Sequence, residues 1–448
     1  MNNRAFKDTK IHDWFGSLMV FLQPRVLVIL ILGFSAGLPY MLIFGTLFAW
    51  LTEAGVSKTI IGTFALVGIT YSIKVFWAPL ADHVPLPILS LLGRRRSWMM
   101  LGQVGIIIGL LGMALTDPSI AITQMVAFSL CVAISSATQD IGIDAYRIEA
   151  MDIEYQGAMA GAYIWGWRIG ALVSGAGGLY FSELYTWTQT YIFMALLMGI
   201  GVITVLIIKE PINKDINTDL VEKVKLPELV AKAKIMYVNP FVEFFERCGK
   251  MGIFILAFIC LYKISDIVMG NMAIPFYLDI GFSKSEIAGV TKIFGFFATI
   301  IGAYLGAVLV MRIGLMRTLL LGSILVASTN LLFVGLSQIG HSVPFLMVTI
   351  AADNFSVGIA ATALIAYLSS LVNQNYTATQ YALFSSLMTL PGKLTSGFSG
   401  YIVDQTDFTI FFLYAAAMGI PAILMVIFLM RYQSKIEQTT NPVVGVGE

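Results

Sequence analysis

Residues 26–51 read VLVILILGFSAGLPYMLIFGTLFAWL and contain no charged side chain. A helix of about 20 such residues is long enough to cross the hydrocarbon core of a bilayer, which is ~30 Å thick. Comparable apolar stretches recur along the chain, so the sequence predicts an all-α integral membrane protein with 12 transmembrane helices. The predicted spans are 26–51, 59–80, 97–116, 119–145, 157–180, 189–208, 251–277, 285–311, 316–337, 344–372, 378–402 and 409–430.

The composition supports this prediction and excludes two other classes of protein. Of the 448 residues, 58% are hydrophobic and only 12% are Asp, Glu, Lys or Arg. This is about half the charged fraction of a soluble domain, which excludes a soluble protein. A net charge of +1 leaves no global positive field and excludes a nucleic-acid binder. The three cysteines, Cys131, Cys248 and Cys260, are interpreted as packing residues.

The basic residues are distributed unevenly between the two sides of the predicted membrane. Twenty of the 27 Lys and Arg residues fall on the side of the N-terminus, and only Lys58 and Lys284 fall in the opposite loops. Because short loops rich in Lys and Arg stay in the cytoplasm, we expect both termini to be cytoplasmic. The expected organisation is a cytoplasmic N-terminal segment (1–25), a six-helix bundle (26–208), a cytoplasmic central loop (209–250) with an amphipathic helix over 220–236, a second six-helix bundle (251–431) and a cytoplasmic tail (432–448).

Short matches relate the two halves to each other. Glu53-Ala-Gly-Val-Ser-Lys58 precedes the second predicted span, and Asp279-Ile-Gly-Phe-Ser-Lys284 precedes the eighth, 226 residues later. Ala145-Tyr146 and Ala366-Tyr367 form a weaker pair, 221 residues apart. Two six-span halves in parallel repeat are typical of secondary carriers, whose substrate path lies between the halves.

Nine ionisable side chains fall inside the predicted spans. Each costs ~2.5–3.5 kcal/mol at the centre of a bilayer on insertion scales, so each requires a structural or functional reason. Their spread over both halves predicts a central hydrophilic cavity. The bases are Lys74, Arg168, Lys263, Lys292 and Lys393, and the acids are Asp140, Asp144, Asp266 and Asp353.

Two groups of these charges are spaced so that they share a helix face. Asp140, Asp144 and Arg147 follow each other at i, i+4 and i+7. Asp144 with Arg147 fits an ion-pair ladder near the cytoplasmic interface, whereas the deeper Asp140 fits a functional group that faces a cavity. Lys263 and Asp266, at i and i+3, can pair with each other, which leaves structural and functional roles equally open.

Coupling to protons would require a buried carboxylate, because the three histidines lie outside the predicted spans. Asp140 is the first candidate and Asp266 the second. A lysine close to either acid would hold it ionised instead. The histidines are His12, His83 and His341.

A motif follows the second predicted span. Ala78-Pro-Leu-Ala-Asp82-His83 is followed by the insertion Val84–Leu92 and then by Gly93-Arg94-Arg95-Arg96. This resembles the signature of the major facilitator superfamily between spans two and three, a Gly-x-Leu-Ala-Asp-Arg core followed closely by Gly-Arg-Arg. The resemblance implies that the aspartate lies near a helix N-terminus of the other half and that the arginines pair with acids, which latches the cytoplasmic side. The gating residues expected are Asp82, Arg94, Arg95, Arg96, Asp144 and Arg147.

The insertion Val84–Leu92 and the stretch Ala137-Thr-Gln-Asp140-Ile-Gly-Ile-Asp144-Ala-Tyr-Arg147 look like the AmpG branch of this superfamily. AmpG proteins are inner-membrane permeases of Gram-negative bacteria that import anhydromuropeptides, the products of cell-wall turnover, by proton symport. The family also includes eukaryotic acetyl-CoA transporters. Some bacterial members have extra C-terminal spans, whereas this chain has one short polar tail after Arg431.

The resemblance implies a monomeric transporter of the bacterial inner membrane, with a muropeptide-like solute and protons as partners and no cofactor. Basic groups would bind the carboxylates of the solute, and aromatic faces its sugar rings. Asp140 and Asp266 would couple transport to protons. The expected substrate-binding residues are Tyr40, Gln139, Trp165 and Arg168 in the first half and Lys263, Lys292, Asn354 and Lys393 in the second.

Two alternative functions remain to be weighed against this one. Asp140-x-x-x-Asp144 could hold Mg²⁺ for diphosphate chemistry in a membrane enzyme, although no second acid-rich stretch accompanies it in the sequence. The other alternative is a permease of the same fold for a different ligand, such as a nucleotide-like cofactor, a siderophore or a drug.

Overall fold

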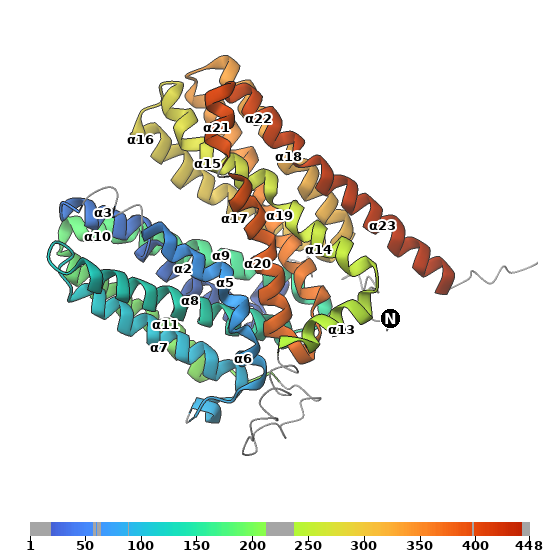
Figure 1. Cartoon of the computed structure of the whole chain (residues 1–448), viewed down its shortest axis with the longest axis horizontal. Helices are drawn as coiled ribbons and strands as arrows, with labels where there is room; N and C mark the ends of the chain where they lie inside the picture. Colours follow the sequence, from blue (N-terminus) through green and yellow to red (C-terminus); the bar gives the residue numbers. More distant parts are fainter. Residues whose placement is uncertain are drawn as a thin grey trace, which may run out of the picture. The chain divides into compact units, whose positions relative to one another are not determined.

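The structure is a computed structural model that describes residues 19–56, 60, 64–87, 89–211, 237–396 and 398–440 of the chain. These residues form helices and turns, and no strand occurs among them (Figure 1). The prediction of an all-α protein is therefore confirmed. The expected N-terminal segment up to residue 18, the amphipathic helix expected over 220–236 and the tail beyond residue 440 lie outside the described residues.

Within the described ranges, nine helices are long and apolar enough to cross a membrane. They coincide with nine of the predicted spans, because the length of an apolar run is matched to the thickness of the bilayer and a helix satisfies all its backbone hydrogen bonds internally. The nine helices are Pro24–Glu53, Arg94–Ala114, Ile122–Ala150, Trp187–Ile207, Met251–Asp279, Gly289–Ile313, Leu315–Ile339, Val343–Leu371 and Phe408–Tyr432.

The other three predicted spans are also helical where the structure describes them, but each is built from shorter pieces. Glycine or proline lies in or next to these pieces, and both weaken a continuous helix. The pieces are α5 (Ile69–Ile73), a 3₁₀ turn (Lys74–Phe76) and α6 (Ala78–His83) in the second span, α9 (Gln156–Leu172), a π-helical turn (Val173–Gly177) and α10 (Gly178–Leu184) in the fifth, and α20 (Thr377–Ser396) and α21 (Ser399–Gln405) in the eleventh.

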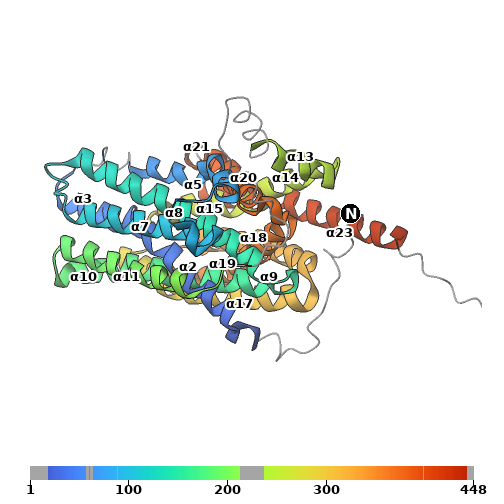
Figure 2. The ribbon, with the colours of Figure 1, turned by 90° about the horizontal axis from the view of Figure 1, so that it is seen from below.

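The chain divides into two compact units, and unit 1 comprises Met1–Gly252 and Ile365–Ser386. In this unit α2 (Pro24–Leu42) packs along α9, and α7 (Arg94–Ala114) packs along α8 (Ile122–Ala150). α11 (Trp187–Ile207) contacts both α7 and α2 (Figure 2). The end of α19 (Val343–Leu371) and the start of α20 belong to the same unit. A segment from late in the sequence is therefore packed among the early helices.

Glycines allow α2 and α9 to touch backbone to backbone. A Cβ atom added at Gly37 would overlap the carbonyl oxygen of Trp167, and one at Gly166 would overlap the carbonyl oxygen of Leu30. Small residues at membrane helix contacts permit such close approach. The contact fixes the rotation of α9, and with it the direction of the side chains that follow Gly166.

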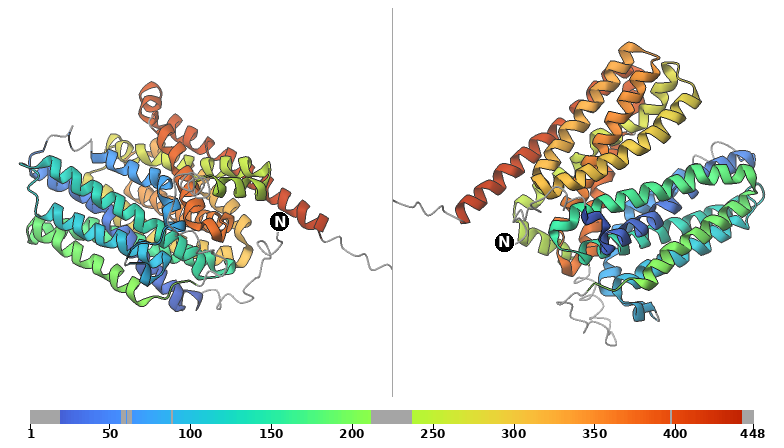
Figure 3. Two further views of the ribbon diagram at one scale, coloured as in Figure 1. Left: turned by 60° about the horizontal axis from the view of Figure 1, so that its bottom comes forward. Right: turned by 180° about the vertical axis from the view of Figure 1, so that it is seen from behind.

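Unit 2 comprises Ile253–Leu364 and Leu387–Glu448, which include most of the yellow, orange and red helices (Figure 3). α18 (Leu315–Ile339) packs on α17 (Gly295–Ile313), α22 (Phe408–Ala417) and α23 (Ile420–Thr440). α15 (Ile264–Asp279) contacts α18 and α22. Interlocking aromatic rings fill the core between these helices: Phe276, Phe333, Phe411 and Phe412.

Candidate functional site

A buried aspartate at the end of α6 accepts four hydrogen bonds in unit 1. One oxygen of Asp82 accepts from the guanidinium of Arg95 at 2.8 Å and from the backbone N–H of Ala378 at 3.0 Å. The other accepts from the backbone N–H of Thr379 at 2.8 Å and from its hydroxyl at 2.7 Å. These backbone donors belong to the first turn of α20, where N–H groups lack helical partners and the helix dipole favours an anion.

The guanidinium of Arg95 is fully buried and is neutralised by two acids. It lies 2.8 Å from Asp82 and 2.5 Å from Glu149, and it also donates to the carbonyl oxygen of Ala81 at 2.9 Å. A buried charge is tolerated only when its partners are this close. We call this cluster the latch, and it consists of Asp82, Arg95, Glu149, Ala378 and Thr379.

Of the two neighbouring arginines, Arg94 binds next to the latch and Arg96 binds the end of α11. Arg94 donates to the carbonyl oxygen of Asp82 at 3.1 Å and lies 3.4 Å from Glu149. Arg96 donates to the carbonyl oxygens of Val205 and Leu206 at the end of α11, both at 2.8 Å. Arg94 and Arg95 therefore both bind Asp82 and Glu149, whereas Arg96 binds the end of α11, and of the three only Arg95 contacts the carboxylate of Asp82.

Sequence reasoning missed two acids at this end of unit 1. Glu149 binds Arg95, and Glu210 accepts the backbone N–H groups of Arg95 and Arg96 at 2.6 and 3.2 Å, which caps the start of α7. Gly93 stands at the N-cap of α7 and offers no side-chain acceptor. The lack of a side-chain acceptor at this N-cap was the feature of the sequence that could have indicated a distant acid, because the first N–H groups of a helix require an acceptor from elsewhere.

The charged face of α8 forms an ion-pair cluster with Lys74. The ammonium of Lys74 lies 3.7 Å from Asp144, and the guanidinium of Arg147 lies 3.6 Å from the same carboxylate. Arg147 also donates to the hydroxyl of Ser369 at 2.9 Å and lies over the ring of Tyr381. Ser369 and Tyr381 belong to the late segment of unit 1, so this ladder ties α8 to that segment.

Asp140 and Gln139, about one turn before Asp144 on α8, have different surroundings. Asp140 is buried, and its Oδ1 has no hydrogen-bond partner among the described atoms. Gln139 is fully buried, and its amide donates to the carbonyl oxygen of Ser35 at 3.1 Å and accepts from the Ser35 hydroxyl at 2.8 Å. The structure thus places Gln139 in the contact between α8 and α2, and not on the cavity-facing surface that the sequence suggested.

An aromatic cluster surrounds Tyr40 in unit 1. Its ring lies 5.4 Å from the ring of Trp167 and 6.2 Å from that of Tyr71, and it is 36% exposed. Arg168 is close enough to interact electrostatically with Tyr40. Trp165 lies instead near Phe21, at 6.0 Å, so it is separated from this cluster by its place on the helix. Sequence reasoning named Tyr40, Trp165 and Arg168 but missed Trp167, whose neighbouring position gave no distinguishing signal.

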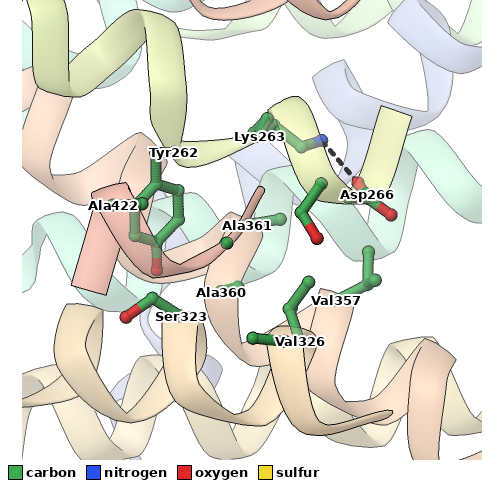
Figure 4. A pocket seen from close by; sticks show the side chains of 12 residues that line it. Tyr262, Lys263, Asp266, Ser323, Val326, Val357, Ala360, Ala361 and Ala422 are labelled. Carbon is green, nitrogen blue, oxygen red and sulfur yellow. Dashed lines mark ion pairs between the residues drawn. The ribbon is translucent and has the colours of Figure 1, made fainter. Parts of the chain in front are cut away.

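In unit 2 the seventh span is interrupted at Lys263, between α14 (Met251–Tyr262) and α15. The ammonium of Lys263 lies 3.6 Å from the carboxylate of Asp266, and both side chains are about a quarter exposed, at 25% and 22%. Figure 4 shows this pair at the side of a small pocket, with Tyr262 and Ser323 at the other end and alanine and valine side chains between them. The pairing that their spacing permitted is therefore present.

The remaining predicted residues of unit 2 are spread over other helices. Asn354 on α19 accepts from the hydroxyl of Thr299 at 3.0 Å and donates to the carbonyl oxygen of Ile350. Lys393 is exposed on α20. Lys292 lies in a π-helical turn (Ala288–Phe294), and its side chain is outside the described part of the structure.

Comparison with known proteins agrees with this arrangement. The Major Facilitator Superfamily model matches residues 27–277 and 253–445. A protein named putative transporter AmpG 4 from Rickettsia felis is 32% identical over 415 residues, covering 92% of this chain and 98% of the relative. The anhydromuropeptide permease of Escherichia coli K12 is 32% identical over 412 residues, covering 92% of this chain and 80% of the relative.

The chain belongs to the AmpG branch of the major facilitator superfamily. It is a multi-pass membrane transporter and not an enzyme, so the Mg²⁺-dependent alternative is excluded. Solved structures share the fold at low identity. The proton:xylose symporter XylE has a TM-score of 0.64 at 11% identity, covering 92% of this chain and 94% of the other. The human organic anion transporter MFSD10 has a TM-score of 0.63 at 13% identity, covering 92% and 99%.

A short helix of the central loop is attached beside the latch of this AmpG-branch transporter, to the turn between α19 and α20 and to Gln380. Glu243 on α13 (Asn239–Cys248) accepts from Asn373 at 2.8 Å and from Gln380 at 2.7 Å, and it pairs with Arg247 at 2.8 Å. Arg247 in turn donates to the carbonyl oxygen of Leu371 at 2.6 Å. These contacts hold the turn between α19 and α20, whose next residues bind Asp82.

This attachment predicts a pH-dependent stability. Burial opposes ionisation of Glu243, but the bonds from Arg247, Asn373 and Gln380 outweigh it and hold the pKa of Glu243 below its ordinary value of 4.5. A lowered folded-state pKa stabilises the protein above the unfolded-state pKa, and this contribution is lost as the pH falls through the folded-state pKa. Glu243→Gln should therefore lower the unfolding temperature of the detergent-solubilised transporter at pH 7, and the difference from wild type should shrink below about pH 4.

The exposed Glu246 on the same helix provides the control for this experiment. Glu246→Gln should leave the unfolding temperature unchanged at both pH values. An equal loss of stability for both variants at pH 7 would contradict the role given to Glu243.

Proposed function

We propose that this transporter resides in the bacterial inner membrane with both termini in the cytoplasm and imports anhydromuropeptides from the periplasm by proton symport, for cell-wall recycling. The observation that carries the proposal is the 32% identity with the anhydromuropeptide permease of Escherichia coli along 92% of the chain. The orientation is supported by the excess of Lys and Arg in loops on one side, and six-helix halves over 26–208 and 251–431 remain the expected organisation. The working form is expected to be a monomer.

The latch and the α8 ladder fit a gate on the cytoplasmic side. Asp82 and Arg147 each bind the late segment of unit 1, Asp82 through the first turn of α20 and Arg147 through Ser369. We propose that these contacts break and reform during alternating access. The gate would be supported by Arg94, Arg96 and Asp144, which would position the helices next to it.

The substrate groups are proposed for each unit separately. In unit 1, Arg168 beside the rings of Tyr40 and Trp167 offers a cation for a carboxylate and flat apolar faces for sugar rings. In unit 2, the pair of Lys263 and Asp266, whose side chains are about a quarter exposed, offers charges of both signs. Trp165, Lys292, Asn354 and Lys393 remain candidates from the sequence.

Proton coupling requires a carboxyl group that can take up and release a proton within the membrane. Asp140 and Asp266 are the candidates that the sequence names. Asp140 is buried, and its Oδ1 has no described partner, whereas Asp266 is paired with Lys263.

Uptake of labelled GlcNAc-anhydroMurNAc tests the proposed function. Cells that express the transporter should accumulate the label, and a protonophore should abolish the accumulation. Uptake that persists without a proton gradient would reject symport. A purified transporter that is stabilised against heat by a nucleotide-like cofactor, a siderophore or a drug, but not by the muropeptide, would favour the alternative ligand, since a bound ligand stabilises the folded state by mass action.

Arg168→Gln is expected to weaken substrate binding without unfolding the protein. Loss of one charge-assisted hydrogen bond, about 1.5–3 kcal/mol, should raise the half-saturating concentration of GlcNAc-anhydroMurNAc roughly 10- to 100-fold. Concentration-dependent uptake measures this change. Arg317→Gln is the matched control, because Arg317 is exposed, and an equal effect of both substitutions would contradict a specific role for Arg168.

A further inference from the structure

We propose that Asp353, on α19 in unit 2, is the carboxyl group that carries the coupling proton. The inference rests on the proposed proton symport and replaces the two candidates named from the sequence. It assigns a function to an acid that neither the latch nor the substrate groups use.

Asp353 lies among polar groups from two neighbouring helices. Its side chain is buried, and its Oδ1 lies 3.5 Å from the hydroxyl of Thr329 on α18. It is within electrostatic range of Asp266 and Tyr277 on α15. Val357, one turn further along α19, lines the same pocket as Asp266 (Figure 4), so the face of α19 that carries Asp353 is turned toward that pair.

The balance of charges around Asp353 differs from the balance on the charged face of α8. In unit 1, Lys74 and Arg147 face Asp140 and Asp144, so the four groups are neutral when all are ionised. In unit 2, Asp353 interacts electrostatically with Asp266, whose carboxylate is already paired with Lys263. Among the described residues Asp353 forms no ion pair, so its negative charge has no base in direct contact.

An unpaired charge in a low-dielectric environment is removed most directly by a proton. Burial of an unpaired carboxylate is strongly unfavourable, whereas the neutral acid needs only a hydrogen-bond partner, which the hydroxyl of Thr329 can supply. In the proposed step one proton binds a carboxylate oxygen of Asp353, and an O–H bond forms. The same bond breaks when the proton leaves to water, and no other group is oxidised or reduced.

The coupling step follows from the same charges. When Asp353 is protonated, Lys263 and Asp266 form a neutral pair beside it. When Asp353 is ionised, it repels Asp266 and competes for Lys263. Since this pair borders the pocket, the protonation state of Asp353 changes the charge that a solute encounters there.

Proteoliposomes can separate coupling from transport itself. With GlcNAc-anhydroMurNAc as the probe, Asp353→Asn should lose accumulation driven by a pH gradient and retain exchange of internal for external probe, which requires no net proton movement. Asp353→Glu keeps a carboxyl group and should retain both activities. Asp404→Asn, at an exposed position in α21, should resemble wild type.

The possible outcomes are distinguishable. If wild-type protein neither accumulates nor exchanges the probe, the proposed function fails. If wild-type protein accumulates the probe and Asp353→Asn accumulates it equally well, the assignment of Asp353 is overturned and the proposed function stands. Loss of both accumulation and exchange in Asp353→Asn and in Asp353→Glu would also overturn the assignment, because it would mark a structural role.

Discussion

Replacing Asp82 by asparagine is expected to abolish transport and to destabilise unit 1. The carboxylate uses both oxygens, one for Arg95 and Ala378 and the other for the two donors of Thr379. Asparagine keeps one acceptor oxygen, but its N–H₂ group is a donor and would face donors that now bind a carboxylate oxygen. Removal of one partner of a buried ion pair costs about 3–5 kcal/mol, and Arg95 would keep Glu149 as its acid.

Two measurements check this expectation. Uptake of the labelled muropeptide should fall to background for Asp82→Asn, and the unfolding temperature of the solubilised transporter should drop. Asp117→Asn is the matched control, since Asp117 is exposed and bonds only Ser119 among the described partners. A variant at Asp82 with unchanged unfolding temperature would show that the latch does not stabilise the protein in solution.

Replacing Gly166 by alanine is expected to have the largest effect on folding itself. The added methyl group would overlap the carbonyl oxygen of Leu30 and would lie 2.7 Å from the backbone nitrogen of Phe34. Both atoms belong to the backbone of α2, so rotation of a side chain cannot relieve the contact. Separation of α2 from α9 should cost about 3 kcal/mol, the upper end of the usual penalty for overpacking a core.

Gly199→Ala on α11 is the control for this substitution, because nothing lies within 4 Å of the added Cβ. Alanine favours helix over glycine by about 1 kcal/mol, so this control should be neutral or slightly stabilising. The fraction of solubilised protein that elutes as a single species after heating measures the difference. Equal heat resistance of the two variants would contradict the close packing of α2 on α9.

The sequence was most informative where a property depends on nearby residues. Uninterrupted apolar runs predicted the nine long helices. Apolar runs also predicted the second, fifth and eleventh spans, but as continuous helices, whereas these spans are divided at glycine and proline. The spacing of Lys263 and Asp266 predicted their pairing. The spacing of Asp144 and Arg147 likewise predicted an ion pair, and the structure adds Lys74 to it.

Other parts of the site depended on contacts between distant segments. Gln139 looked like a cavity residue because it precedes Asp140, but its amide is used by Ser35, 104 residues earlier. Glu149 and Glu210 had no distinguishing pattern around them. Their roles depend on Arg95 and on the start of α7, which only packing brings to them.

The sequence by itself therefore determined that this is a helical, multi-pass membrane protein with charges of both signs in its spans. Span length and charge distribution are local properties that the thickness and polarity of the bilayer select directly. Only the tertiary structure decided which charges pair with each other. Pairing depends on the rotation and approach of helices, such as α2 on α9, and these are fixed by contacts between residues more than a hundred positions apart.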